Sequence, residues 1–489
     1  MPLPLAVDHQ GPAPIQRQLA EHLRGLILRG LLPPGSRLPS TRALSQQLSV
    51  SRGTVVIAYH RLAAEGYIET QSTSPTRVSR VLPEQFITTD PDSTSRKSAD
   101  GLPDALSFHA AGPRLFDPAQ DGLVYDFRLG RAESSFFPIK AWRRLIPECL
   151  GGAPHPLSRY GDPAGYWPLR KAIAEHLRSA RGILCTPEQV IVTGGVQEGL
   201  NIVSRLLLKP DSAVIVENPC YQGAAGVFES YWARLVPIPV DGNGIDADRL
   251  HESDARLAYV TPSHQFPLGS TLSLARRHKL LDWAVARDGY VIEDDYDSDF
   301  RYRDSPLPAL KALDRADRVI YLGTFSKSIG AGLRLGYMVV PSRLAGATVA
   351  AIALAGNGHP WLEQAVVAEF MRSGAFEEHL RRIRKRYMAR RDCLADRLHQ
   401  HFGTAVAVHG GDAGMHVAVH LPKIPITAHA LQIRLKRSSV GVYALAESPA
   451  RLFDPFPGDD RVILLGYACL SEDKITEAVS RLAAAARTA

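Results

Sequence analysis

The chain has 489 residues, 45% of them hydrophobic and 22% charged, which predicts two or three domains and is typical of a soluble globular protein. We find no run of about 20 apolar residues that could cross a membrane and no export signal at the N-terminus. The five cysteines are scattered and odd in number, which argues against a disulfide framework, predicts no metal site and favours a cytoplasmic protein.

The net charge of +7 is concentrated near the N-terminus. Residues 1–80 hold nine arginines, no lysine and four acidic residues. A small basic module joined to a nearly neutral body is typical of a protein that docks on nucleic-acid phosphate. A merely solvated basic face is the competing interpretation.

The first 80 residues predict three helices followed by a two-stranded wing, at 15–29, 40–48, 52–65, 67–70 and 77–79. Apolar residues recur with a helical period in the first of these segments. Ser40 and Ser51 precede the second and third helices, where a serine hydroxyl can accept a hydrogen bond from the first turn. Gly66 ends the third helix. We therefore expect an α+β winged helix-turn-helix over residues 12–80.

Residues 81–107 are rich in Pro, Ser, Thr and Asp and predict an exposed linker. Residues 108–489 alternate β-rich runs with helical patterns, and the runs lie at 189–192, 213–216, 257–260, 290–293, 319–322 and 335–340. This rhythm predicts an α/β domain with a mostly parallel, doubly wound sheet over about 125–355. A smaller α+β lobe is expected over about 356–489.

The segment LPPGSRLPSTRALSQQLSVSRGTVVIAYHRLAAEGYIET resembles the winged helix of GntR-type bacterial repressors. A recognition helix reads the major groove with its N-terminal residues, and a preceding helix contacts phosphate. The candidate contacts to double-stranded DNA are therefore Arg37, Ser40, Arg42, Ser51, Arg52, Thr54 and Arg77. The wing tip lacks the glycines common in such domains, so Arg77 is a candidate from its position alone.

The motif GTFSKSIGAGLRLG resembles the lysine loop of fold-type I enzymes that use pyridoxal 5'-phosphate. The resemblance implies that Lys327 forms a Schiff base with this cofactor, and that Thr324, Ser326 and Arg334 bind its phosphate. In VIEDDYDSDF, it implies that Asp294 pairs with the pyridine nitrogen and Tyr296 with the 3-hydroxyl. Asp295 is the competing choice for the carboxylate.

Other motifs resemble the same family in the same order along the chain. VTGGVQEGL runs from a strand into a helix, where Gly194, Gly195 and Val196 can present N–H groups to phosphate. The remaining candidates are Tyr221 for stacking on the ring, His264 or Gln265 in place of the usual asparagine, and Tyr160 reaching the phosphate of a partner subunit.

The two halves together resemble MocR-type regulators, which include sensors of γ-aminobutyrate, taurine and vitamin B6. The resemblance implies a homodimer, of which a domain-swapped, head-to-tail form is one arrangement. Leu464 and Gly223 stand where amino-acid-binding relatives carry arginines, with Arg128 and Arg131 as other carboxylate partners. We therefore expect a transcription regulator of vitamin B6 metabolism that responds to the cofactor itself.

Two alternatives remain open at this point. One is a regulator that senses a γ-aminobutyrate-like or taurine-like amino compound. The other is a working class I/II aminotransferase with an appended DNA-binding module. The absent arginines favour a regulator with at most residual transaminase activity, because transamination needs a firmly held amino acid.

Overall fold

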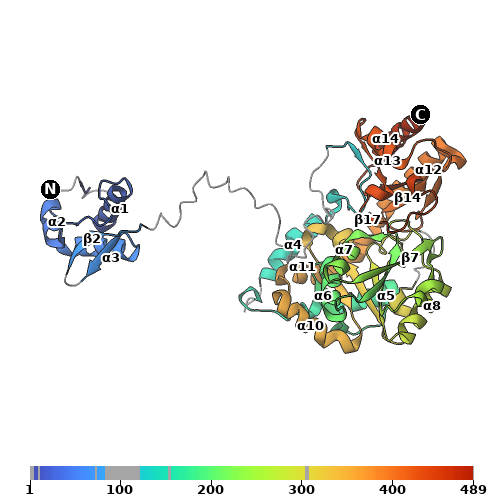
Figure 1. Ribbon diagram of the computed structural model, residues 1–489, viewed down its shortest axis with the longest axis horizontal. Helices are drawn as coiled ribbons and strands as arrows, with labels where there is room; N and C mark the ends of the chain where they lie inside the picture. Colours follow the sequence, from blue (N-terminus) through green and yellow to red (C-terminus); the bar gives the residue numbers. More distant parts are fainter. Residues whose placement is uncertain are drawn as a thin grey trace. The chain divides into compact units, whose positions relative to one another are not determined.

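The computed structural model describes residues 5–8, 12–71, 74–82, 122–151, 156–302 and 308–487. The chain divides into two compact units, residues 1–106 and 107–489 (Figure 1). The predicted linker at 81–107 lies almost wholly outside the described residues. None of the described helices is both long and apolar enough to span a membrane.

The first unit consists of three helices and a two-stranded antiparallel wing: α1 (Ile15–Leu28), α2 (Thr41–Leu48), α3 (Arg52–Ala64), β1 (Ile68–Gln71) and β2 (Ser74–Val78). Ser40 caps α2 by accepting a hydrogen bond from the N–H of Ala43 at 3.2 Å, and Ser51 caps α3 by accepting from Thr54 at 3.1 Å. The three helices and the wing enclose one apolar core, in which Leu19, Leu44 and Val55 are fully buried.

The second unit is built on an eight-stranded sheet with the order β4-β12-β11-β10-β9-β5-β7-β8. Its strands are β4 (Val190–Thr193), β5 (Ala213–Asn218), β7 (Arg234–Asp241), β8 (Gly244–Ile245), β9 (Leu257–Val260), β10 (Tyr290–Asp295), β11 (Val319–Thr324) and β12 (Gly336–Val339). The central strands are parallel, whereas β12 runs antiparallel to both β11 and β4. A doubly wound, mostly parallel sheet was predicted, and this sheet confirms it.

Helices cover both faces of this sheet (Figure 1). Successive side chains of a strand point to opposite faces, so Val214 joins the core beneath α6 (Val196–Leu207), α7 (Gln222–Ser230) and α10 (Ser342–Gly356). Ile215, the next residue, joins the core beneath α8 (Leu274–Ala286). The same face is covered further along by α4 (Ile139–Leu150), α5 (Trp167–Arg181) and α11 (Trp361–Arg372).

The C-terminal lobe has a four-stranded antiparallel sheet with the order β13-β14-β18-β16. Its elements are α12 (Ala375–Phe402), β13 (Ala407–His409), β14 (His416–His420), α13 (Ala428–Lys436), β16 (Tyr443–Ala444), β18 (Val462–Gly466) and α14 (Glu472–Arg487). Short two-stranded pairs join distant segments: β3 (Tyr125–Asp126) with β15 (Val440–Gly441), and β6 (Cys220–Tyr221) with β17 (Ala450–Arg451). The turn between β13 and β14 returns to the large sheet, where Gly414 donates to Phe300 O at 2.8 Å.

Candidate cofactor site and nucleic-acid interface

The predicted cofactor residues meet at one edge of the large sheet. The carboxyl ends of parallel strands open at the same edge, where α/β proteins bind ligands. His264 follows β9, Asp294 and Tyr296 stand at the end of β10, and Lys327 follows β11. The sheet order β11-β10-β9 makes these three ends adjacent.

Lys327 lies in a turn of π-helix, Ser326–Gly330, directly after β11. Its side chain is half-buried, and Nζ donates a hydrogen bond to the backbone oxygen of Gly130. Burial lowers the pKa of the amine, while the negative charges of Asp297 and Asp294 act in the opposite direction. A lowered pKa favours the neutral amine, which is the form that attacks a carbonyl carbon.

The two neighbouring carboxylates of β10 have different surroundings. Asp295 forms a buried ion pair with Arg181 at 2.9 Å and accepts from the hydroxyl of Tyr321 at 2.5 Å. Asp294 has no cationic partner among the described ion pairs; its Oδ2 accepts from the hydroxyl of Tyr259 at 2.7 Å, and its buried Oδ1 has no hydrogen-bond partner. Burial raises the pKa of Asp294 to about 7. Of the two, Asp294 is thus the carboxylate without a cationic partner among the described ion pairs.

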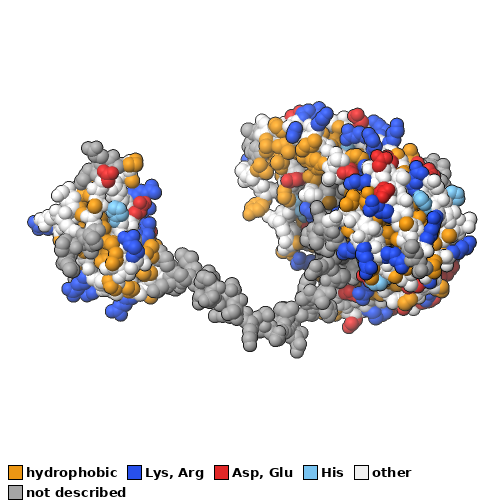
Figure 2. Space-filling model, turned by 90° about the horizontal axis from the view of Figure 1, so that it is seen from above, with side chains coloured by type: hydrophobic (Ala, Val, Ile, Leu, Met, Phe, Trp, Pro, Cys, Tyr) orange, Lys and Arg blue, Asp and Glu red, His pale blue; other side chains and the backbone are white. Residues whose placement is uncertain are grey.

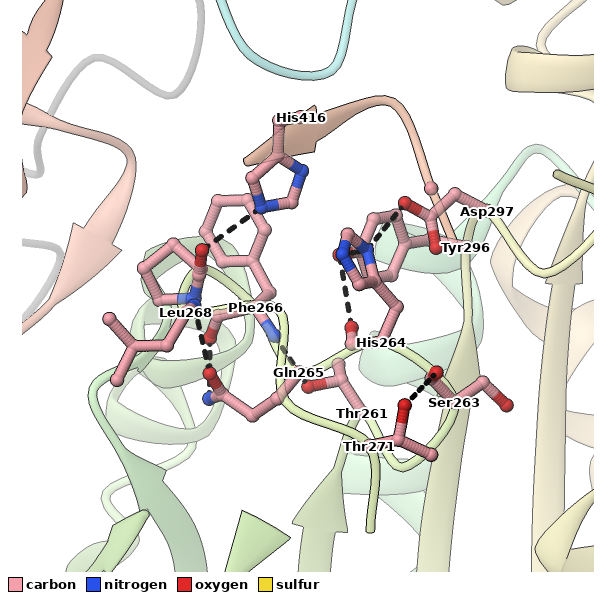
Figure 3. A network of polar contacts seen from close by, with 12 residues as sticks. Thr261, Ser263, His264, Gln265, Phe266, Leu268, Thr271, Tyr296, Asp297 and His416 are labelled. Carbon is pink, nitrogen blue, oxygen red and sulfur yellow. Dashed lines mark hydrogen bonds and ion pairs between the residues drawn. The ribbon is translucent and has the colours of Figure 1, made fainter. Parts of the chain in front are cut away.

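The loop after β9 carries the residues that the sequence placed in the position of an asparagine. Gln265 is engaged within the protein, because its amide donates to Pro219 O at 2.8 Å and to Glu217 Oε2 at 3.3 Å. His264 contacts Tyr296 and Asp297 instead (Figure 3). Phe266, which sequence reasoning did not single out, has its ring 5.7 Å from that of Tyr221 and 6.0 Å from that of Tyr296.

The predicted phosphate-binding groups gather at the N-terminus of α6. Gly195 is the N-cap with φ of 123°, a conformation that favours glycine. A Cβ atom placed there would lie 3.6 Å from the guanidinium of Arg334, so the two approach closely. Val196 begins the helix, whose first-turn N–H groups suit an anion.

The neighbouring glycine behaves differently. The N–H of Gly194 donates to Glu198 Oε2 at 2.5 Å, and that carboxylate also pairs with His359 at 3.0 Å. Gly194 is therefore engaged within the protein. These residues, with Arg334, line a cavity of about 400 Å³. Thr324 accepts a hydrogen bond from the N–H of Ser326 at 3.1 Å, which orients the turn that carries Lys327.

These groups fit pyridoxal phosphate. The unpartnered Oδ1 of Asp294 suits a pyridine N–H, because a buried carboxylate oxygen without a donor is costly. Because Gly195 has no Cβ atom, the space beside the Arg334 guanidinium stays open for phosphate oxygens. The charged groups of Asp297 and Asp294 lie near the amine of Lys327.

The two positions without arginine are filled in other ways. Leu464 is fully buried in an apolar cluster with Leu129 and Phe266. A Cβ atom at Gly223 would overlap the Gln197 amide and the Tyr221 ring, which are joined by a 3.1 Å hydrogen bond. Neither place can hold a carboxylate clamp.

Arg128 and Arg131, the other candidates for a carboxylate, both lie near Asp126. The distances to Asp126 Oδ2 are 3.4 Å from Arg128 Nε and 3.9 Å from Arg131 Nη1. Arg128 also donates to the hydroxyl of Tyr443 at 3.1 Å. Both guanidinium groups therefore already have a carboxylate of the protein as a partner.

Three buried side chains near Lys327 could also hold a metal ion by proximity alone. The ligand atoms of His264, Asp297 and His416 lie within 4.8 Å of one another. His264 and Asp297 are instead joined by a 2.9 Å hydrogen bond, and His416 Nε2 lies 3.0 Å from Pro267 O (Figure 3). Asp297 directly follows Tyr296 in the acidic motif, which is the signal that could have singled it out.

The arginines of the first unit fall into two groups, those that pair with a carboxylate and those that do not pair with one among the described residues. Arg17 pairs with Glu21 on α1, and Arg24 and Arg61 pair with Glu65. The exposed side chains of Arg37, Arg42 and Arg52 have no carboxylate partner among the described residues. Arginine side chains are visible along the edges of this unit in Figure 2. The unpaired charges belong to the start of α2, the start of α3 and the turn before α2.

The other predicted DNA contacts are Ser40, Ser51, Thr54 and Arg77. Ser40 and Ser51 are exposed caps, and the first turns of α2 and α3 contain no acidic residue, so both helix N-termini suit phosphate. The hydroxyl of Thr54 lies 2.8 Å from that of Ser51. Arg77 is half-buried and donates to Gly35 O at 2.9 Å, which ties the wing to the turn before α2.

Tyr160 lies in the segment that was predicted to reach a partner subunit. Its side chain is 89% exposed. Trp167 at the start of α5 and Leu157 nearby are also exposed, at 47% and 59%. Large exposed apolar side chains within one short segment favour an interaction surface there.

Comparison with known proteins matches both units. The family model for bacterial regulatory proteins of the gntR family matches residues 15–78, and that for aminotransferase class I and II matches residues 126–482. Among solved structures, the α-aminoadipate aminotransferase LysN from Thermus thermophilus, complexed with N-(5'-phosphopyridoxyl)-L-leucine, is 30% identical with a TM-score of 0.66. The match covers 75% of this chain and 92% of that one.

Relatives that share both units are also found. The probable rhizopine catabolism regulatory protein MocR of Rhizobium meliloti is 35% identical over 98% of this chain and 95% of its own. The pyridoxine biosynthesis transcriptional regulator PdxR of Corynebacterium glutamicum is 34% identical over 81% of each chain. A gntR-family winged helix and an aminotransferase class I and II domain thus occur in the same order along nearly the whole length, and the chain belongs to the MocR-type transcription regulators.

Proposed function

We propose that this regulator binds operator DNA with an affinity set by pyridoxal phosphate, held through Lys327, as its effector in the control of vitamin B6 metabolism. The observation that carries the proposal is the contrast between the groups that suit the cofactor and those that would bind an amino-acid carboxylate. Asp294, Arg334 and Lys327 offer groups that suit the ring nitrogen, the phosphate and the carbonyl of the cofactor. The two arginine positions for an amino-acid carboxylate are Leu464 and Gly223.

The same contrast weighs against the alternatives. Bound pyridoxal phosphate supplies an aldehyde carbon that reacts with primary amines, so a sensor of amines would use the same lysine. An amino acid or a γ-aminobutyrate-like effector would also need a partner for its acid group, and Arg128 and Arg131 already face Asp126. The name of one relative, PdxR, ties that protein to pyridoxine biosynthesis.

The experiment is a titration of a DNA fragment from the chain's own promoter region with the full-length protein. Affinity is measured with the cofactor-free protein, with pyridoxal phosphate added, and with γ-aminobutyrate or taurine added to the loaded protein. We expect the affinity to change with pyridoxal phosphate alone, and the change to vanish in Lys327→Ala. Equal affinities with and without the cofactor, or a response only to an amine, would refute the proposal.

For the DNA surface, we propose contacts from Arg37, Ser40, Arg42, Ser51, Arg52, Thr54 and Arg77. A side chain that binds a base edge in two places contributes about 1–3 kcal/mol of discrimination. Arg52→Ala should therefore weaken operator binding roughly tenfold or more, since about 1.4 kcal/mol is a factor of ten. Arg17→Ala, which removes an arginine already paired with Glu21, is the matched control and should bind normally. Equal losses in both variants would reject this surface.

We also propose a homodimer in which Tyr160 of each subunit completes the phosphate site of the other. Its exposure beside other apolar side chains supports this. Tyr160→Ala and Lys327→Ala should each bind the cofactor poorly as pure proteins. A mixed dimer of the two variants would hold one site with both residues intact, so mixing should restore cofactor absorbance. If mixed dimers, with their composition confirmed by mass, recovered no cofactor absorbance, the shared site would be rejected.

A further inference from the structure

His264 contacts the hydroxyl of Tyr296 with both its backbone and its ring (Figure 3). The hydroxyl oxygen lies 3.0 Å from the backbone oxygen of His264 and 3.2 Å from ring Nδ1. The same Nδ1 lies 2.9 Å from Asp297 Oδ2. The ring is buried, with 2% of the residue exposed. One side chain thus links a buried carboxylate to a phenol at the edge of the cofactor site.

The contacts of the ring decide which nitrogen carries the proton. Nε2 is buried and has no hydrogen-bond partner among the described residues. It faces two glycines, Gly269 and Gly410, where an added Cβ atom would lie 3.1 Å and 3.0 Å from it. An N–H there would have no acceptor, whereas an N–H on Nδ1 has a carboxylate. The neutral ring therefore carries its proton on Nδ1 and donates it to Asp297.

That proton also faces the oxygen of Tyr296. With Nδ1–H beside one lone pair, the phenol can direct its own proton elsewhere, and in this structure it donates to the His264 backbone oxygen. Burial, followed by the negative charges of Asp297 and Asp294, holds the pKa of Tyr296 well above its usual range. The phenol is therefore a hydrogen-bond donor and not a phenolate.

The other groups around this contact add little positive charge. His416 lies against His264 with ring centroids 4.8 Å apart and the rings tilted by 53°, and burial lowers the pKa of His416 to about 4, which keeps it neutral. Lys327 provides the nearby amine, and Asp294 provides the second carboxyl group. A negatively charged oxygen that enters the site is a better acceptor than a neutral carbonyl, because charge-assisted hydrogen bonds are stronger.

We propose that His264, held by Asp297, is a positioning residue: it fixes the Tyr296 oxygen so that the hydroxyl turns from the His264 backbone oxygen to the 3-oxygen of pyridoxal phosphate when the cofactor is bound. The inference rests on the proposed function, because it needs the cofactor in this pocket. A hydrogen-bond donor at the 3-oxygen stabilises the negative charge on that oxygen. The stabilisation is greatest once the proton that the oxygen shares with the lysine-linked nitrogen has left. It therefore lowers the pH at which the visible absorbance of the bound cofactor changes.

The experiment is a pH titration of that absorbance in the full-length, cofactor-loaded protein. Tyr296→Phe removes the donor and should raise the midpoint by about one pH unit, the size expected for one hydrogen bond to a charged group. His264→Leu should raise it in the same direction. His264→Asn keeps an N–H near the position of Nδ1. Its midpoint should therefore lie at least halfway back from the His264→Leu value to the wild-type value.

The double variant separates a positioning role from a direct one. If His264 acts through Tyr296, His264→Leu adds no further shift in the Tyr296→Phe protein. An additional shift there, or no shift in His264→Leu alone, would overturn the proposal. Should His264→Leu fail to fold, His264→Gln fills a similar volume with its N–H further out, and the same shift is expected.

Two further measurements concern the lysine linkage and a bound metal. A visible band that persists in Lys327→Ala, or no band at all in the wild-type protein, would contradict the proposed function itself and not the role of His264. A metal ion bound in stoichiometric amount to the purified protein and lost in Asp297→Asn would also overturn the proposal, since the trio would then be ligands.

Discussion

In the cofactor-free protein, Asp294→Asn is expected to lower stability at low pH and to raise it, relative to the wild type, at high pH. Burial raises the pKa of Asp294 to about 7 from an ordinary value of 3.8. The folded chain then holds this proton more tightly than the unfolded chain does, so the wild-type protein loses stability as the pH rises through that interval. Asparagine cannot ionise, and its amide oxygen can still accept the hydrogen bond from Tyr259.

The magnitude follows from the shift in pKa. A difference of about 3 units corresponds to about 4 kcal/mol once the carboxyl is fully ionised, of which about 3 kcal/mol falls between roughly pH 5 and pH 8. The variant buries an amide N–H without an acceptor, which costs about 1–3 kcal/mol at any pH. The wild-type protein should therefore be the more stable at the lower pH, and the variant should gain about 3 kcal/mol relative to it by the higher pH.

The assay is urea unfolding followed by tryptophan fluorescence. All five tryptophans lie between residues 142 and 361, so the signal reports the second unit alone. Glu293, whose pKa burial also raises to about 7, is the same in both proteins and cancels from the difference. The pKa of Glu217 is raised by burial and in small part by the charge of Asp294, so removing that charge stabilises the variant slightly further at high pH. A difference between variant and wild type that stays constant with pH would refute the reasoning about Asp294.

Three further outcomes are expected. Arg334→Ala loses a charge-assisted contact to phosphate and should raise the cofactor Kd roughly tenfold or more; an absorbance titration within about twofold of wild type would contradict this. Gly223→Ala should also weaken the cofactor, because its methyl group displaces the Tyr221 ring, and an unchanged Kd would show that the ring is not needed. Ser51→Ala removes the cap of α3 and should cost about 1 kcal/mol, seen as faster hydrogen exchange of α3 amides; unchanged rates would rule out the cap.

Local patterns were sufficient to predict the elements. Ser40 and Ser51 marked two helix starts because a cap is a contact between residues three apart. The strands at 257–260 and 319–322 were visible as apolar runs because parallel strands are buried on both faces. The strand Arg234–Asp241 was missed, since it contains two prolines and is only partly buried near the end of the sheet.

Long-range contacts were beyond the reach of such patterns. Asp294 and Asp295 are equivalent in the sequence, and the choice between them depends on Arg181, which lies 114 residues away. The assignment of His264 rested on its place in a motif, while its partner Asp297 and the glycines that enclose it come from three separate segments. Whether His264 contacts the cofactor directly stays a prediction.

Gly223 has a consequence for how ligand preference can change over generations. An arginine there would have to displace both the Gln197 amide and the Tyr221 ring, and these two are bonded to each other. A single codon change would thus damage the existing pocket before it created a new one. Descendants of this chain that bind a carboxylate through an arginine at position 223 should therefore also carry an altered residue 197 or 221. Such joint substitutions can be sought in their sequences.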